Sequence, residues 1–377
     1  MRLKPLAPRV LLSLSVSTLV LIGGTPAAAQ QQALPDGWGY GFQIHLWHLS
    51  QDAKTQMVGQ VRQAGFNWIT QQIDWTALEP ASGEYDWSEA DAIVDAASRA
   101  GLKIMLSVAH APSFYIADPT NGLMPADPAT FQQVMQAMAT RYAGRVQAYE
   151  LWNEENLARE AGFGNVDPST YLPLVQAGYT GVKTGDPTAL VLLGAPSPTG
   201  ANIDGVSIDD LTYLQQLYAI NGGEVMGYFD VLSAHPSGFS NPPECTPDTP
   251  ECSLSGAWND NPSFFGLYRV GQYRDVMVEN GDGGKPIWLT EFGYCSNPTP
   301  PPGYEYCAYI SEDTQARFLG QAFQMARQTG YVGAMFQWNL NFQVSVPQAD
   351  EKWGFSIMRA NWSGRPAYFA LAQMPKL

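Results

Sequence analysis

The sequence predicts a single (β/α)8 barrel, in which eight parallel strands close into a ring and helices cover the outside. The first observation is a repeated alternation of short apolar segments with longer amphipathic segments. The second is that residues 36–377 contain no internal repeat, long linker or break in composition. The third is that no Gly-rich phosphate loop follows the first apolar segment, which argues against the alternative of an open, doubly wound sheet.

Eight segments have the length and apolar content of strands. They are residues 40–46, 67–73, 103–108, 147–152, 190–194, 229–234, 287–290 and 332–338. Helical patterns lie between them, for example at residues 52–63, 89–99, 128–143, 211–219, 267–279 and 312–328. Ser311 stands where an N-cap is expected before the last of these helices. The loops after the sixth and seventh strands, 236–263 and 292–310, are unusually long and are expected on one face.

The four cysteines all lie in these two loops. An even number in an exported chain indicates disulfides, although four cysteines allow three pairings. Each pair of neighbours in the sequence brackets a Pro-rich stretch, which favours Cys245–Cys252 and Cys295–Cys307. A zinc site is the competing interpretation, but His235 is the only histidine near these cysteines and the ligands would be widely spaced.

The N-terminus has the composition of an export signal. The first nine residues hold three positive charges, residues 10–22 form an apolar run, and small residues lead up to Ala29. This order predicts a secretory signal peptide over residues 1–29, and therefore an extracellular or periplasmic protein. The apolar run is too short for a membrane span, and no later segment approaches one.

The chain is acidic, with 35 acidic and 20 basic residues and a formal charge of −15. Loss of the three positive charges of the predicted signal would make the charge −18. Such a surface repels phosphate backbones, so nucleic-acid binding is not expected. The charge is compatible with neutral sugars as ligands, and equally with the solubility of an exported protein.

Reactive side chains gather at the C-terminal ends of the predicted strands, which is where a barrel places its functional residues. The six are His45, His110, Glu154, His235, Glu291 and Trp338. Hydrolysis of a glycoside needs one carboxylic acid that donates a proton and a second, ionised carboxylate. Glu154 and Glu291 end the fourth and seventh strands, across the barrel mouth from each other. The sequence therefore predicts that residues 30–377 form a glycoside hydrolase domain with these two catalytic residues.

Five further residues are predicted to bind substrate. The amide of Asn153 suits a sugar hydroxyl beside the anomeric carbon, and Trp338 offers a flat face for a sugar ring. His110, His235 and Gln72 lie where groups that contact the sugar or the nucleophile are expected. For the two histidines, a purely structural place in the interior remains the alternative.

Two motifs carry a family resemblance. Trp152-Asn153-Glu154 and Trp288-Leu-Thr-Glu291-Phe-Gly293 resemble the acid/base and nucleophile strands of glycoside hydrolase clan A, which includes families 5 and 39. The stretches 75–87 and 364–368 are also similar to segments of these enzymes, so the resemblance runs from about residue 39 to the C-terminus.

This resemblance implies roles for the predicted residues. Glu154 would be the acid/base, Asn153 would hold the 2-hydroxyl, and Glu291 would be the nucleophile of a retaining, double-displacement hydrolase that needs no cofactor or metal. The expected ligand is a β-linked oligo- or polysaccharide and the expected form is a monomer. Two alternatives stay open, a non-catalytic carbohydrate-binding barrel and a transglycosylase that uses the same residues.

Overall fold

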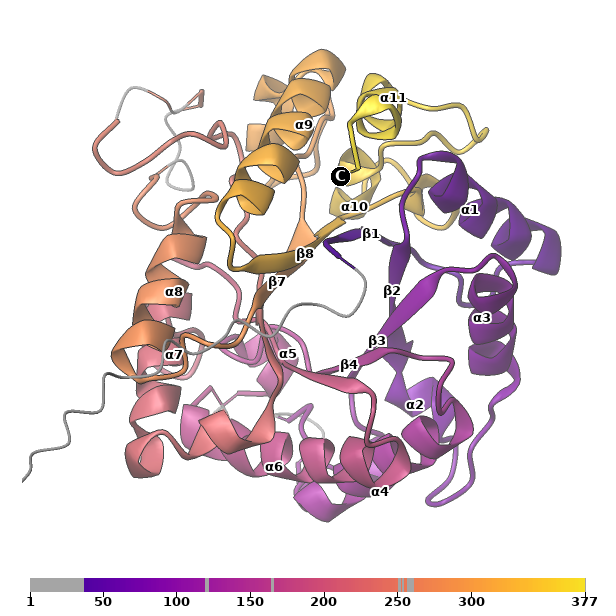
Figure 1. Cartoon of the computed structure of the whole chain (residues 1–377), viewed down its shortest axis with the longest axis vertical. Helices are drawn as coiled ribbons and strands as arrows, with labels where there is room; N and C mark the ends of the chain where they lie inside the picture. The colour runs from indigo at the N-terminus through magenta and orange to yellow at the C-terminus, as the bar shows by residue number, and fades with distance from the viewer. Residues whose placement is uncertain are drawn as a thin grey trace, which may run out of the picture. The chain divides into compact units, whose positions relative to one another are not determined.

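The computed structural model describes residues 37–118, 122–163, 166–249, 252, 254–255 and 261–376. Eight parallel strands form a closed barrel in which each strand pairs with the next and β8 returns to β1 (Figure 1). Closure is made by the pairing of Gly41 with Phe336 and of Phe42 with Gln337. The predicted (β/α)8 barrel is confirmed. The predicted signal peptide, residues 1–29, lies outside the described residues.

The strands agree with the predicted segments to within a few residues. They are β1 (Gly39–Gln43), β2 (Trp68–Asp74), β3 (Lys103–Ala109), β4 (Ala148–Leu151), β5 (Leu190–Leu193), β6 (Val231–Ala234), β7 (Ile287–Phe292) and β8 (Val332–Gln337). All are buried almost throughout, as parallel strands covered by helices on one face and a filled interior on the other must be.

Helices surround the sheet (Figure 1). They are α1 (Gln51–Gln63), α2 (Trp75–Leu78), α3 (Ser88–Arg99), α4 (Pro128–Arg141), α5 (Ala158–Ala161), α6 (Pro168–Gly185), α7 (Asp210–Ala219), α8 (Arg269–Glu279), α9 (Glu312–Gln328), α10 (Glu351–Phe355) and α11 (Pro366–Gln373). The predicted N-cap is confirmed, since the Ser311 hydroxyl accepts a hydrogen bond from the Thr314 amide at 3.0 Å. Among the described residues, no helix has the length and apolar character needed to cross a bilayer.

The lower half of the barrel interior is apolar and tightly filled. Its large members are Trp68, Trp288 and Phe336, which meet edge to face or tilted at ring separations of 5.0–6.3 Å. β1 makes room for them with glycines, because a Cβ on Gly41 would lie 2.1 Å from the Phe336 ring and one on Gly39 would lie 2.6 Å from Ala334. This layer is a packed core in the usual sense.

Two residues further along each strand, toward its C-terminal end, the interior of the barrel becomes polar. Since side chains alternate between the two faces of a strand, the residue two positions after each lower-layer residue points inward again. In β3, β4, β6 and β7 these residues are Ser107, Glu150, Ser233 and Thr290, and all four are buried. They form the floor on which the mouth of the barrel is built.

Candidate active site

A bulge in β7 turns two consecutive residues toward the mouth. The pairing of β7 with β8 shifts register between Leu289 and Phe292, so strict alternation is lost there. Thr290 stays inside, where its hydroxyl lies 3.1 Å from His235 Nε2. Glu291, the next residue, also faces the mouth, and its Oε2 lies 3.9 Å from His235 Nδ1. The bulge therefore lets one strand supply both a buried anchor and an accessible carboxylate.

Glu154 is presented by a turn with unusual backbone conformations. Trp152 and Glu154 have φ values of 79° and 45°, a region that costs energy for residues other than glycine. The turn is held to the segment after β5 by the buried Asn156, whose Nδ2 donates to the carbonyls of Ser197 and Ile208 at 2.8 and 2.7 Å. The Glu154 amide also donates to the Ala195 carbonyl at 3.1 Å. Rigid support on both sides fixes where the carboxyl group points.

Glu154, His235 and Glu291 converge into one cluster, which we call the Glu–His–Glu trio. His235 Nδ1 lies 3.3 Å from Glu154 Oε1, and one ring nitrogen and one oxygen from each carboxylate all lie within 4.8 Å of one another. The imidazole is 5% exposed, whereas the carboxyl groups of Glu154 and Glu291 are 13% and 26% exposed. The structure thus brings together both predicted carboxylates and places the predicted histidine between them.

The environment of the trio displaces all three pKa values. Burial opposes the charge on Glu154, but its contacts with His235 and Arg159 outweigh burial and lower the pKa to about 2. Burial, reinforced by the charge of Glu154 and opposed by that of His235, raises the pKa of Glu291 to about 7. Burial also opposes the charge on His235, yet the charges of Glu291 and Glu154 raise its pKa to about 9. In the free cleft the proton therefore favours Glu291 over Glu154, the reverse of the order expected for an acid/base and a nucleophile.

The outer oxygen of Glu154 is held by a chain of charged groups from the short helix α5. Arg159 Nη2 donates to Glu154 Oε2 at 2.6 Å, and Arg159 Nε lies 3.6 Å from Glu160 Oε1. The other oxygen of Glu160 lies 3.3 Å from Nε2 of His110. That contact is the largest influence on His110 and raises the pKa of its imidazole. The predicted His110 is therefore linked to Glu154 through Glu160 and Arg159.

All seven predicted site residues line one cleft of about 1300 Å³ above the barrel. Asn153 lies beside Glu154, and Gln72 lies at the end of β2. Trp338 packs edge-on against Phe355 and Phe342, with ring centroids 4.7 and 6.0 Å apart, while its ring also lines the cleft. These residues were predicted to lie at or near the ends of strands, and the closed barrel brings the C-terminal ends of its strands together.

Several residues of the site were not identified from the sequence. Gln43, at the end of β1, hydrogen-bonds Glu291 and opposes the rise in its pKa. The strand-end rule could have found it, whereas Arg159 lies in a turn whose shape no spacing reveals. Glu155 is also unexpected: it is 1% exposed, its Oε2 has no hydrogen-bond partner, and burial raises its pKa to about 8.

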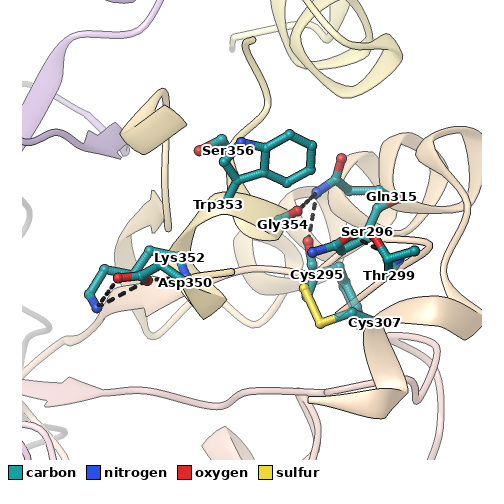
Figure 2. Close-up of a disulfide and its surroundings, with 12 residues drawn as sticks. Cys295, Ser296, Thr299, Cys307, Gln315, Asp350, Lys352, Trp353, Gly354 and Ser356 are labelled. Carbon is teal, nitrogen blue, oxygen red and sulfur yellow. Dashed lines mark hydrogen bonds and ion pairs between the residues drawn. A yellow bond between two sulfur atoms is a disulfide. The ribbon is translucent and has the colours of Figure 1, made fainter. Parts of the chain in front are cut away.

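Both predicted disulfides, Cys245–Cys252 and Cys295–Cys307, are confirmed. The second one lies behind a wall of the cleft. Gly354 lies against Cys295 (Figure 2), where a Cβ would stand 2.4 Å from the sulfur. The carbonyl of Gly354 accepts hydrogen bonds from the Ser296 amide at 2.9 Å and from Gln315 Nε2 at 3.3 Å. Lys352, two residues earlier, lines the cleft, so the disulfide and α9 together fix this wall.

The trio has the atoms of a metal site as well as those of an acid–base site. Within the part of the chain that the structure describes, it is the one group of three or more histidine, cysteine or carboxylate side chains with suitable spacing. The raised pKa of His235, caused against burial by the two carboxylates, keeps the imidazole protonated near neutral pH. A metal ion would have to displace that proton from His235 and compete with Arg159 for Glu154. The contacts present are those of an acid–base site.

Solved structures with the same fold come from several glycoside hydrolase families. A family 39 glycoside hydrolase from Bacteroides cellulosilyticus is similar with a TM-score of 0.65 and 20% identity, over 90% of this chain and 63% of that one. A GH5_18 protein from Streptomyces cattleya matches with a TM-score of 0.64 and 14% identity, over 89% and 79%. Xylanase 10B from Thermotoga maritima matches with a TM-score of 0.59 and 15% identity, over 90% of this chain and 94% of that one. At these identities the likeness shows the fold.

Sequence comparison identifies the family. Endo-1,4-beta-xylanase C from Paenibacillus barcinonensis is 29% identical over 153 residues, which span 36% of this chain and only 14% of that protein. The family model for cellulases, glycosyl hydrolase family 5, matches residues 30–263, more than half of the chain, in a segment that includes Glu154 and ends before Glu291. The chain therefore belongs to glycosyl hydrolase family 5, within clan A.

Proposed function

We propose that the protein is a retaining hydrolase of β-linked glycans, with Glu154 as acid/base and Glu291 as nucleophile. The observation that carries this proposal is the approach of the two carboxylates, which have oxygens within 4.8 Å of each other in an open cleft. Retaining enzymes hold their carboxyl groups roughly 5–5.5 Å apart, whereas inverting enzymes need about 6.5–9.5 Å to admit a water. The short separation therefore favours double displacement.

In the first step, Glu291 Oε attacks the anomeric carbon while Glu154 gives its proton to the leaving oxygen. The bond from carbon to the leaving oxygen breaks and a glycosyl ester with Glu291 forms. Charge develops on the ring in this transition state, and an amide at Asn153 is suited to the hydroxyl beside the anomeric carbon, where a hydrogen bond strengthens as charge develops. Gln43 supports the ionised form of Glu291, because its hydrogen bond opposes the rise in pKa that burial causes.

In the second step, Glu154 takes a proton from water, and the water oxygen attacks the anomeric carbon and releases Glu291. Two inversions at the same carbon give net retention. If a sugar hydroxyl replaces water, the same residues perform transglycosylation, which is the second candidate reaction.

The substrate proposed is a β-1,4-linked polysaccharide such as xylan or cellulose, with the predicted catalytic domain, residues 30–377, as the acting unit. The cleft volume of about 1300 Å³ exceeds what a drug-sized ligand fills, and aromatic rings of Tyr304, Tyr306 and Trp338 lie along it. The family match to cellulases and the similarity to a xylanase support the choice. Two disulfides are compatible with export through the predicted signal peptide. The monomeric state stays a prediction.

The test is to identify the covalent residue. A 2-deoxy-2-fluoro xylobioside or cellobioside with a good leaving group should label the protein once, and peptide mass spectrometry should place the label on Glu291. Glu154→Ala should keep activity on activated aryl glycosides and gain activity with azide, giving a β-glycosyl azide. Label on another residue, or an α-configured product from the wild-type enzyme, would contradict the proposal.

The non-catalytic alternative is tested with the same variants. A barrel that only binds glycans would release no reducing sugar from xylan or cellulose, and Glu291→Gln would bind the polysaccharides as the unchanged protein does. The hydrolase should instead lose at least about 10⁴-fold in kcat in this variant.

A further inference from the structure

Both oxygens of Glu154 are occupied in the free cleft. Oε1 lies 3.3 Å from Nδ1 of the buried His235, and Oε2 accepts a hydrogen bond from Arg159 at 2.6 Å. An acid/base must carry a proton on one oxygen and direct it at the leaving group. A carboxylate that accepts a hydrogen bond from a cation on each oxygen is held in its ionised form, which opposes the protonation that an acid needs. Glu154 therefore gains its proton more easily when one of the two partners moves away.

Arg159 is the partner that can move. Its side chain is 64% exposed, whereas His235 is 5% exposed and is also held through Nε2 by Thr290. Arg159 projects from α5, a single turn of helix. A second carboxylate is already within reach, since Glu160 Oε1 lies 3.6 Å from Arg159 Nε. A small rotation would move the guanidinium from the carboxylate of Glu154 to that of Glu160, so that Arg159 would keep an anionic partner throughout.

We infer that Arg159 is a positioning residue that holds Glu154 ionised in the free enzyme and transfers to Glu160 when a sugar occupies the leaving-group side of the cleft. The inference rests on the roles proposed above for Glu154 and Glu291. Once Arg159 has left, the carboxylate of Glu154 loses a compensating cation and becomes the better site for a proton. Arg159 thus determines which of the two carboxyl groups is the acid.

The exchange conserves protons. Below about pH 7 the trio of the free enzyme holds two protons that matter, one that makes His235 a cation and one that is favoured on Glu291 over Glu154. Catalysis needs the same number, with the second proton on Glu154. His235 Nδ1 lies 3.3 Å from Glu154 Oε1 and 3.9 Å from Glu291 Oε2, so the imidazolium can give its proton to Glu154 and regain one from Glu291. No proton enters or leaves, and the departure of Arg159 shifts the distribution toward Glu154.

Other titratable groups surround Glu154 and the two residues of this exchange. They are His235 just after β6, Glu291 from β7, Glu150 and Glu155 from β4 and the turn after it, Glu160 beside Arg159, His110 against Glu160, and Tyr304 from the loop after β7. Because Arg159 alone among them is both charged and largely exposed, it is the group that a ligand can displace.

The experiment compares two pH profiles. The profile of kcat/KM reports the free enzyme and that of kcat reports the enzyme–substrate complex. Xylohexaose and cellohexaose are the probes, because their sugar leaving groups require protonation. In Arg159→Met the alkaline limb of kcat/KM should move to higher pH by roughly half a unit or more, since a cation beside the carboxyls is lost. The alkaline limb of kcat should stay where it is, because Arg159 has already left Glu154 in the complex.

Glu160→Gln gives the opposite separation. It removes the receiving carboxylate, so Arg159 stays longer on Glu154 in the complex, and the alkaline limb of kcat should move to lower pH by roughly half a unit while that of kcat/KM barely changes. Arg99→Met is the matched control, because it removes the same charge from an exposed residue at the end of α3. Both of its limbs should coincide with those of the wild type.

Limbs that move together, or limbs that do not move in either variant, would overturn the inference while leaving the proposed roles intact. The same holds if Arg159→Met is folded by circular dichroism but inactive, because Arg159 would then act in catalysis itself. A wild-type enzyme that hydrolyses neither hexasaccharide would overturn the proposed substrate instead.

Discussion

The lower and upper halves of the barrel interior are built by the same strands and have opposite character. β1 contributes Gly41 to the lower half and Gln43 to the upper, and β7 contributes Trp288 and then Thr290 and Glu291. Below, aromatic rings fill the space, and above, carboxyl groups are buried against a histidine with displaced pKa values. The difference teaches that residues only two positions apart on one strand can have separate roles. The lower residues stabilise the fold, whereas the upper ones form the site and lower the stability of the fold by burying charged groups.

The largest expected effect is on the upper half, from His235→Gln. Glu154 and Glu291 lose the cation between them, so neither the positions of the two carboxyl groups nor the distribution of protons between them is kept. We expect kcat to fall by roughly 10³-fold, equivalent to about 4 kcal/mol, while the melting temperature stays equal or rises. Kinetics and thermal denaturation on one preparation measure both. Thr290→Val, which keeps the imidazole and removes its Nε2 partner, should lose only roughly tenfold. A large fall in stability would mean that the mouth also holds the fold together.

The lower half should respond in the opposite way. In Gly41→Ala the new methyl group meets the Phe336 ring at 2.1 Å, so the free energy of unfolding should fall by about 3 kcal/mol while kcat per folded molecule is retained. Urea denaturation measures the loss. Gly59→Ala in α1 is the control, since nothing lies within 4 Å of its Cβ, and a helix gains roughly 0.5–1 kcal/mol from this change. Equal responses of the two variants would refute the packing argument.

Glu155 tests the cost of burying acids near the mouth. Burial raises its pKa to about 8 from an ordinary value of 4.5, so the folded state binds a proton that the unfolded state has lost. Stability from this group is therefore present below about pH 4.5 and is lost as pH rises toward 8. Glu155→Gln should match the wild type near pH 4.5 and exceed it by about 4 kcal/mol at pH 8. Parallel stability curves for the two proteins would show that Glu155 does not titrate in this range.

The smallest effect concerns Gln43. Its hydrogen bond favours the ionised form of Glu291, so Gln43→Ala should raise the pKa of Glu291 further above 7. The alkaline limb of kcat/KM should move up by roughly half a unit, and the plateau should fall, because the proton is held on the nucleophile. Arg159→Met moves the same limb without this fall in plateau. If the two variants behave alike, the proton is not divided between the carboxyl groups in the way described.

The sequence predicted more of the framework than of the electrostatics. Strand ends located Glu154, Glu291, His235 and Trp338, because parallel strands of a barrel bring their C-terminal ends together whatever the loops do. The place of Arg159 follows from the turn after Glu154, whose positive φ values no pattern of residue types encodes. The pKa order follows from distances between side chains of different strands, and these depend on the bulge in β7. Sequence patterns therefore locate the strands and their ends, whereas the contacts between side chains of different strands follow only from the three-dimensional structure.

The anchor of the cleft wall at Gly354 also bears on how the lining of the cleft could change. Its carbonyl oxygen receives donors from three distant parts of the chain, Ser296, Gln315 and Arg365, at 2.9–3.3 Å. In the neighbouring tip, Ser345, Val346, Glu351 and Lys352 line the cleft but do not carry that anchor. New tip sequences could therefore be grafted onto a fixed base, so that diversification of the binding surface and preservation of the barrel become separate problems.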